Sequence, residues 1–268
     1  MAALGWLNDR ATNMKKHAYL LLLVALVFAC NKRKLFDGPN AFEDDFESYS
    51  NMDALFVTPD SNWSYFQNTI AGNAISVDTS KAHSGTQSIR FEAKAAVEGG
   101  TASKASIAKQ KLAFWEGETM HAEAWYYLEG TDSLKWLFLM DLEEQTAIGA
   151  GPGIRLALVN DKIRVEHKYL VPDILQIPAQ TTTFPRNQWV LLALEIKLSQ
   201  KKKGTVKVWQ DGKLIIEASE RQTLPTDILY AQQGTKGMYS SMEFGLTANS
   251  FENDAVLFLD DIKFFRLN

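Results

Sequence analysis

The feature that most constrains this sequence is a series of short strand patterns joined by two-residue turns. Apolar and polar side chains alternate through residues 153–169 on both sides of Asn160-Asp161, and residues 206–217 repeat the arrangement around Asp211-Gly212. Asn, Asp and Gly tolerate the positive φ that such turns require, so both segments predict β-hairpins. From Phe42 onward no convincing helical period of apolar residues interrupts the strand patterns. The sequence therefore predicts an all-β fold.

Longer strand patterns indicate how the sheets pack. In residues 189–198 and 119–128 the even positions are apolar, which gives each strand one continuous apolar face. Residues 134–142 also form a strand pattern, in which Trp136 and Phe138 are expected on the buried face. Strands with one apolar face must cover it with a second sheet. We therefore expect a two-sheet antiparallel jelly-roll sandwich.

The first thirty residues have the pattern of an export signal. Lys15 and Lys16 precede an apolar run, residues 18–29, which is shorter than the about 20 residues that span a bilayer. The run ends in Val27-Phe28-Ala29-Cys30, which resembles the lipobox of bacterial lipoproteins, in which the chain is cut before a cysteine that carries lipid. An ordinary secretory signal is the alternative.

This pattern sets the expected organisation of the chain. Residues 1–29 are expected to be an extension and signal peptide, residues 30–40 a lipidated cysteine and tether, and residues 41–268 a single jelly-roll domain. The domain would then be anchored by lipid in a bacterial cell envelope, with the outer membrane favoured.

Composition excludes several classes of protein. The chain has 28 Lys+Arg and 32 Asp+Glu, a net charge of −4, so it lacks the positive charge with which proteins bind nucleic acid. Cys30 is the sole cysteine, so neither an intramolecular disulfide nor a cysteine-rich zinc site can form.

Several segments taken together resemble a known superfamily. They are Phe42–Tyr49, Asp78–Phe91, Trp189–Leu198, Gly204–Gly212, Phe244–Leu246 and Leu257–Ile262. Their order resembles the concanavalin A-like lectin/glucanase superfamily, and within it the jelly rolls related to heparin lyase I and glucuronan lyase. The resemblance implies a protein that engages a polysaccharide, but it includes no catalytic signature.

An aromatic and polar stripe is expected on the strand of residues 119–128. Its odd positions share the outward face and carry His121, Glu123, Trp125 and Tyr127. Such a stripe can bind sugars, because aromatic rings stack on C–H-rich ring faces and polar groups bind hydroxyls. A solvated strand with paired aromatic side chains is the alternative.

A cationic cluster is expected on the Asn160-Asp161 hairpin. The turn sets Arg155 opposite Glu166 and places Arg155 and Arg164 on one face, and Lys135 faces outward on the preceding strand. Guanidinium groups bind carboxylates through two parallel hydrogen bonds, so the cluster and the stripe together predict one surface for an acidic glycan. A weak surface ion pair between Arg155 and Glu166 is the alternative.

A uronate lyase needs a base for the C5 proton, an acid for the leaving oxygen and a group that neutralises the carboxylate. The candidates are His121 on the stripe, and His167 with Tyr169 at the end of the cationic hairpin. His167 and Tyr169 alternate with Val165, so they could instead close one end of the core. The sequence does not choose between the two histidines.

Acidic residues gather at the two ends of the domain. Asp45 and Glu47 lie near its start, and Asp260 and Asp261 lie in its last strand. In related jelly rolls the first and last strands lie together and bind a structural calcium ion, which prefers carboxylate and carbonyl oxygens. The resemblance therefore implies a calcium site at these residues, and a solvated acidic terminus without metal is the alternative.

The sequence thus predicts a membrane-anchored lipoprotein whose jelly roll binds a polysaccharide, with a uronate-containing one favoured. Two alternatives stay open. The first is a polysaccharide lyase that cleaves a uronate polymer by β-elimination, and the second is a non-catalytic structural protein of the envelope.

Overall fold

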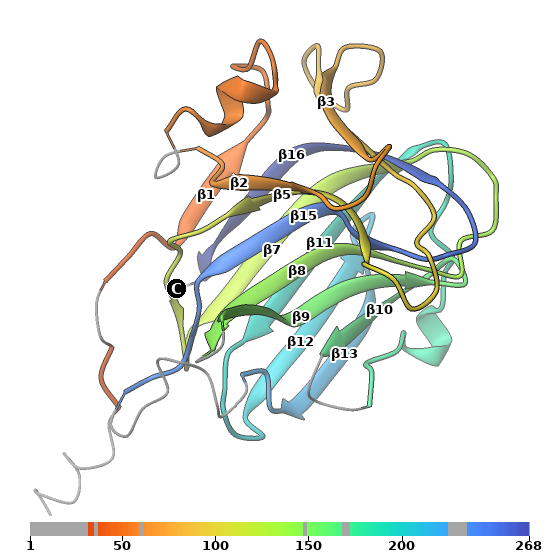
Figure 1. Cartoon of the computed structure of the whole chain (residues 1–268). Helices are drawn as coiled ribbons and strands as arrows, with labels where there is room; N and C mark the ends of the chain where they lie inside the picture. Colours follow the sequence, from red (N-terminus) through yellow and green to blue (C-terminus); the bar gives the residue numbers. More distant parts are fainter. Residues whose placement is uncertain are drawn as a thin grey trace, which may run out of the picture.

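The computed structural model describes residues 32–34, 37–58, 62–146, 149–167, 172–224 and 235–267, with backbone alone at 144–146 and 149–152. Two large antiparallel sheets stack on each other and form the jelly-roll sandwich that the sequence predicts (Figure 1). Within these residues the helical elements are two short 3-10 helices, η1 (Met52–Phe56) and η2 (Pro178–Gln180). No helix in this part of the chain has the length and hydrophobicity needed to cross a membrane.

Among the described residues the larger sheet has eight strands, and it contains both ends of the domain. Its spatial order is β13 (Lys213–Arg221), β12 (Gly204–Gln210), β11 (Trp189–Lys197), β7 (Thr119–Leu128), β16 (Ala255–Leu267), β4 (Ser88–Ala93) and β3 (Ala74–Asp78), and β1 (Ala41–Asp44) also pairs with β16. Because β1 and β16 pair, the acidic residues near the two ends of the domain lie in one region.

The smaller sheet has six strands in the part of the chain that the structure describes. Its spatial order is β10 (Lys162–His167), β9 (Gly149–Val159), β8 (Trp136–Thr146), β15 (Ser241–Asn249), β5 (Ser103–Lys109) and β2 (Tyr65–Asn68), and β6 (Phe114–Trp115) pairs separately with β14 (Met238–Tyr239). The β9–β10 hairpin has the expected register, with Arg155 opposite Glu166. Its turn residues Asn160 and Asp161 have φ values of 48° and 55°, as the turn chemistry requires.

The hydrophobic core lies between the two sheets. The even positions of β7, from Met120 to Leu128, are at most 1% exposed, and the even positions of β11 are buried in the same way. Ile107, Leu142 and Phe244 face them from the smaller sheet within one continuous cluster. Burying each such side chain contributes about 1.5–3 kcal/mol, so this alternation decides which side of each strand faces inward.

Strand β8 does not keep the alternation that the sequence predicts. A register shift between Phe138 and Met140 inserts a bulge, and Leu137 and Leu139 are buried. Trp136 and Phe138 are half-buried, with ring centroids 5.1 Å apart. The prediction that these two aromatic residues lie in the core is wrong, because the bulge shifts the alternation, so that odd positions are buried before it and even positions after it.

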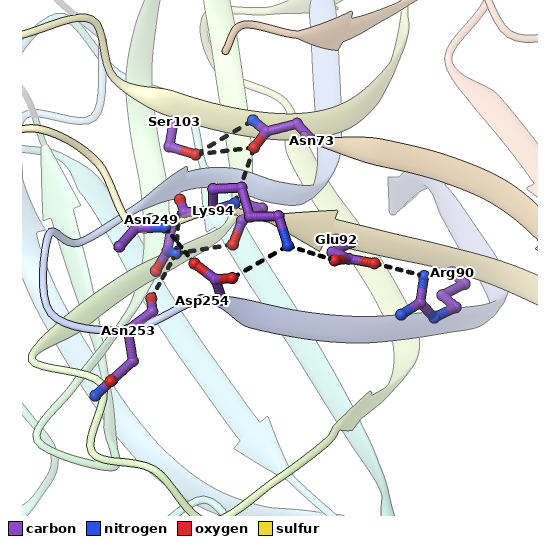
Figure 2. A network of polar contacts seen from close by, with 10 residues as sticks. Asn73, Arg90, Glu92, Lys94, Ser103, Asn249, Asn253 and Asp254 are labelled. Carbon is purple, nitrogen blue, oxygen red and sulfur yellow. Dashed lines mark hydrogen bonds and ion pairs between the residues drawn. The ribbon is translucent and has the colours of Figure 1, made fainter. Parts of the chain in front are cut away.

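A polar network joins the two sheets at one end of the sandwich (Figure 2). The Asn249 side chain on β15 donates hydrogen bonds to the carbonyls of Ala93 and Lys94, at 3.1 and 3.2 Å. Lys94 Nζ forms ion pairs with Glu92 at 2.7 Å and Asp254 at 3.1 Å. The fully buried Asn249 therefore links the smaller sheet to the end of β4 in the larger one.

Candidate functional site

The outer face of the smaller sheet carries a row of ionisable side chains. Pairing sets Ala108 opposite both Tyr65 and Glu243 on its two neighbouring strands. Asp141 on β8 is opposite both Glu243 on β15 and Arg155 on β9. The row therefore crosses β2, β5, β15, β8 and β9, and it ends on β10, where Glu166 is opposite Arg155. Strands lie about 4.8 Å apart, so the row is roughly 24 Å long.

We call this surface the polar face. Its members lie on β2, β5, β8, β9, β10 and β15, and they are Tyr65, Gln67, Lys104, Ser106, Trp136, Phe138, Asp141, Glu143, Arg155, Arg164, Glu166, Glu243 and Thr247. Ionisable groups whose pKa values are perturbed by burial gather at functional sites more often than elsewhere. The polar face has several such groups.

Glu243 lies at the centre of the polar face and is fully buried. Its Oε1 accepts hydrogen bonds from Gln67 Nε2, at 2.8 Å, and from Ser106 Oγ, while its Oε2 lies 3.6 Å from Lys104 Nζ. Burial raises the pKa of Glu243 to about 8, although the charge of Lys104 opposes the shift. At neutral pH this carboxyl group is therefore largely protonated and can donate a hydrogen bond.

Arg155 is held between a carboxyl group and an aromatic ring. Its Nε lies 3.5 Å from Asp141 Oδ1, and its guanidinium carbon lies 4.2 Å from the centroid of the Phe138 ring. Burial raises the pKa of Asp141 to about 6, and the charge of Arg155 works against that increase. This placement fixes the guanidinium in one orientation on the polar face.

Two buried polar atoms of the row have no hydrogen-bond partner among the described residues. They are Nε of Arg155 and Oε2 of Glu243. Buried polar atoms are nearly always hydrogen-bonded, and an exception is commonly satisfied by water or a ligand. Each of them instead faces an opposite charge within the row, Asp141 Oδ1 at 3.5 Å from Arg155 Nε and Lys104 Nζ at 3.6 Å from Glu243 Oε2.

Tyr65 and Glu143 form a proton-donor and proton-acceptor pair. The Tyr65 hydroxyl donates to Glu143 Oε2 at 3.4 Å, although two strands separate β2 from β8. The side chains of Ala108 and Ser241 on the intervening strands are small, which leaves room for this contact. Burial, followed by the charges of Glu143 and Glu243, raises the pKa of Tyr65, so its phenol stays protonated.

The cations predicted from the sequence have different partners from those expected. Arg164 pairs with Glu166 through Nε, at 2.8 Å, whereas Arg155 pairs with Asp141. The alternative ion pair between Arg155 and Glu166 is therefore not what the structure shows. Lys135 precedes β8 and is exposed, with its Nζ 5.1 Å from the centroid of the Phe251 ring.

The aromatic stripe lies on the other sheet. His121, Glu123, Trp125 and Tyr127 are half-buried on the outer face of β7, which pairs with β11 and β16 rather than with β8. The stripe and the Arg155 hairpin therefore lie on opposite outer faces of the sandwich. The prediction that they form one binding surface is wrong, because side-chain alternation does not specify the sheet to which a strand belongs.

The candidate catalytic histidines lie away from the polar face. His121 Nε2 is 2.8 Å from Glu123 Oε2 on the stripe. His167 lies on the core side of β10 with Val165, where burial lowers its pKa to about 4. It lines a hollow of about 250 Å³ at the edge of the core, which matches the alternative role of closing one end of the core. Tyr169 and Cys30 lie outside the described residues.

The residues of the expected calcium site bind a neighbouring loop instead. Asp260 Oδ2 accepts the backbone N–H of His83 at 2.8 Å, and Asp261 Oδ2 lies 2.6 Å from His83 Nδ1. Glu47 accepts two backbone N–H groups of the same loop, and Asp45 accepts the N–H of Glu47.

These carboxylate oxygens already accept hydrogen bonds from N–H donors, and a calcium ion would need the same lone pairs. The described residues contain no group of three or more His, Cys, Asp or Glu side chains able to hold a metal. Calcium binding therefore stays a prediction of the resemblance, and no step of the proposed chemistry uses it.

The buried carboxyl of Glu243 makes stability depend on pH. Its pKa is about 8 in the folded chain and 4.5 in the absence of burial, so ionisation costs folding free energy. The melting temperature of the wild type should fall as pH rises from about 4.5 to about 8, and Glu243→Gln should fall less over this window. Each kcal/mol corresponds to about 2–4 °C, which calorimetry resolves. Parallel pH profiles for the two proteins would contradict the assignment.

The chain is similar in sequence and in fold to proteins that act on polysaccharides. The sequence profile of a family described as polysaccharide lyase matches residues 57–263, and the chain therefore belongs to this polysaccharide lyase family. No curated protein matches the chain.

Solved structures share the fold at low sequence identity. The endo-β-1,4-glucuronan lyase of the fungus Trichoderma reesei superposes with a TM-score of 0.62 at 11% identity, over 85% of this chain and 95% of that one. The cellulose-induced protein Cip1 gives 0.57 at 16% identity, over 83% and 96%. The alginate lyase Aly36B gives 0.56 at 9% identity, over 87% and 99%. These likenesses establish the jelly roll, and family membership indicates a protein that acts on polysaccharide.

Proposed function

We propose that this protein binds a uronate-containing polysaccharide across the polar face and cleaves it by β-elimination. The observation that carries the proposal is the row in which a phenol, buried carboxyl groups and a guanidinium lie on adjacent strands. Membership of a polysaccharide lyase family supports cleavage. Two similar structures are lyases named for glucuronan and alginate, which supports a uronate as the sugar.

Arg155 is the group that would bind the uronate carboxylate. Its side chain is 16% exposed on the polar face, and a guanidinium binds a carboxylate more strongly than a neutral donor does. Neutralising the carboxylate makes the C5 proton more acidic and stabilises the negative charge that develops when it leaves.

Glu143 and Tyr65 would carry out the proton transfers. The Glu143 carboxylate takes the C5 proton, the electrons of the C5–H bond form the C4–C5 double bond, and the bond from C4 to the glycosidic oxygen breaks. The Tyr65 phenol protonates that oxygen as it leaves. The phenol then recovers a proton from Glu143, whose Oε2 lies 3.4 Å away.

Trp136 and Phe138 would contact the sugar rings beside Arg155. Both are half-buried, and the Phe138 ring already packs on the Arg155 guanidinium. Aromatic side chains offer flat apolar surfaces with little entropy to lose on binding, which suits the C–H faces of sugars. The bulge in β8 is what brings these rings out of the core.

The test is an absorbance assay with a panel of polymers. The full chain is incubated with glucuronan, alginate and a neutral glucan, and the absorbance of the unsaturated product is followed. A rise with a uronate polymer and none with the glucan is the expected result. If neither uronate polymer gives a rise at any pH between 5 and 9, β-elimination of these substrates is refuted.

Binding without cleavage is the second candidate. It is favoured by one observation: no histidine lies on the polar face among the described residues. Affinity gel electrophoresis separates the two candidates. Retardation by a uronate polymer without an absorbance rise identifies a binding protein, whereas retardation with a rise identifies a lyase.

We further propose that lipid on Cys30 anchors the protein to a membrane of the cell envelope. The support is the apolar run of residues 18–29, which ends directly before the sole cysteine. Replacing Cys30→Ser should move the protein from the membrane fraction to the soluble fraction and abolish incorporation of labelled palmitate. Wild-type protein that never incorporates the label would contradict the proposal.

A further inference from the structure

The segment that follows Cys30 is held against one end of the sandwich. Lys32 Nζ lies 3.3 Å from Glu116 Oε2 and also donates a hydrogen bond to the side chain of Gln200. Gln200 directly precedes Lys201, Lys202 and Lys203, which are exposed in the loop between β11 and β12. The start of the described chain therefore lies beside the lysine run, far from it in sequence.

Further contacts fix the same segment. Lys34 Nζ lies 2.6 Å from Glu118 Oε1, which also pairs with Arg266 at 3.1 Å. Arg33 forms a parallel bridge with Thr235, and its carbonyl accepts the backbone N–H of Lys236 at 3.0 Å. The segment is thus bound on both sides instead of extending freely from the domain.

These contacts gather positive charge at one end of an acidic protein. We call this region the basic end, and its cations are Lys32, Arg33, Lys34, Lys201, Lys202, Lys203, Lys236 and Arg266. Glu116 and Glu118 among them are 15% and 12% exposed and are already paired, and the exposed Glu220 lines a hollow together with Lys202. The exposed charge of the lysine run is therefore positive, although the whole chain has a net charge of −4.

We propose that the basic end docks on an anionic lipid surface. Cys30 is two residues from Lys32 and the apolar run ends three residues from it, and three extended residues span about 10 Å. A chain held at a membrane by that segment, through lipid or through the apolar run, must keep the basic end against the headgroups. Anionic headgroups attract each nearby lysine or arginine within a Debye length.

This docking orients the proposed site. Strand β12 begins at the basic end, and β8 reaches the same end near Glu143, whose carbonyl accepts the N–H of Ser240. The strands of the sandwich then point away from the membrane, and a polymer that crosses the strands of the polar face runs along the membrane surface. The inference does not depend on whether the polar face binds or cleaves that polymer.

The test separates electrostatic docking from hydrophobic insertion. In the full chain, Cys30→Ser removes the lipid, and replacing each of the four leucines at positions 20–23 with Gln removes the apolar insertion. This parent is sedimented with phosphatidylcholine vesicles that contain or lack phosphatidylglycerol. One variant of it carries K201Q, K202Q and K203Q, and the matched control carries K135Q, K162Q and K213Q, three exposed lysines at the other end of the strands.

The parent should bind vesicles with phosphatidylglycerol and not pure phosphatidylcholine, and high salt should release it. Replacing the lysine run should weaken partition by about 100-fold, about fivefold for each lysine, and the control should bind like the parent. Equal binding by both triple variants, or no binding by the parent, overturns the proposal. If the parent binds no vesicles but is retarded by a uronate polymer through the lysine run, the basic end is a polysaccharide surface instead. Circular dichroism melts check that all proteins are folded.

Discussion

Replacing Tyr65→Phe should lower the rate of β-elimination by about 100- to 10,000-fold, the usual contribution of a positioned acid. The substitution keeps the ring and removes the hydroxyl, which donates to Glu143 Oε2 at 3.4 Å. Without that hydroxyl, the leaving oxygen has no proton donor at this point of the row. The affinity for substrate should change much less than the turnover number, because the phenol acts mainly in the transition state.

A matched replacement on the other sheet controls for nonspecific effects. Tyr127 is half-buried on the outer face of β7, on the opposite side of the sandwich, and Tyr127→Phe removes the same atom. Initial rates of absorbance increase for the two variants and the wild type make the comparison. A loss of similar size in both variants, or full activity in Tyr65→Phe, would show that Tyr65 is not the acid.

Replacing Arg155→Ala should weaken binding of a uronate oligosaccharide by about 10- to 100-fold, the value of a charge-assisted hydrogen bond. The loss should shrink as salt rises, because the interaction is between opposite charges. Arg155→Lys should recover only part of the affinity, since an ammonium cannot form the paired hydrogen bonds of a guanidinium. Isothermal titration of the three proteins measures all of these effects.

The control for Arg155 is an arginine on the other sheet. Arg90 on β4 forms an ion pair with Glu92 at 3.0 Å. It lies on the larger sheet and therefore outside the polar face. Arg90→Ala removes the same charge and should leave the affinity unchanged. Because Arg155→Ala also leaves the buried Asp141 without its cation, melting temperatures must show that the variant is folded at the titration temperature.

The fold could be predicted well from local patterns. Alternation in residues 119–128 and 189–198 identified the buried side of β7 and β11. The β9–β10 turn fixed the backbone register that sets Arg155 opposite Glu166. These features depend on residues close together in the chain. A two-residue turn sets the register of its hairpin, and the buried face needs apolar side chains at every second position.

The site could not be predicted in the same way. Strand β7 pairs with β11 and β16, far away in sequence, so no local pattern shows that the stripe and Arg155 lie on opposite faces.

Sequence reasoning also missed Tyr65, Lys104 and Glu243 as site residues. A signal for Glu243 was present, because residues 241–249 place Ser, Glu, Thr and Asn at odd positions and Met, Phe, Leu and Ala at even ones. That alternation predicts a strand with one polar face.

The central claim is that the polysaccharide binds on the outer face of the smaller sheet. A crystal structure of the chain with a uronate oligosaccharide, using Tyr65→Phe to slow cleavage, tests it most directly. We expect the oligosaccharide to cross β9, β8, β15 and β5, with a carboxylate on the Arg155 guanidinium and the bond to be cut beside Glu143. An oligosaccharide found instead along Trp125 and Tyr127, on the outer face of β7, would contradict the claim.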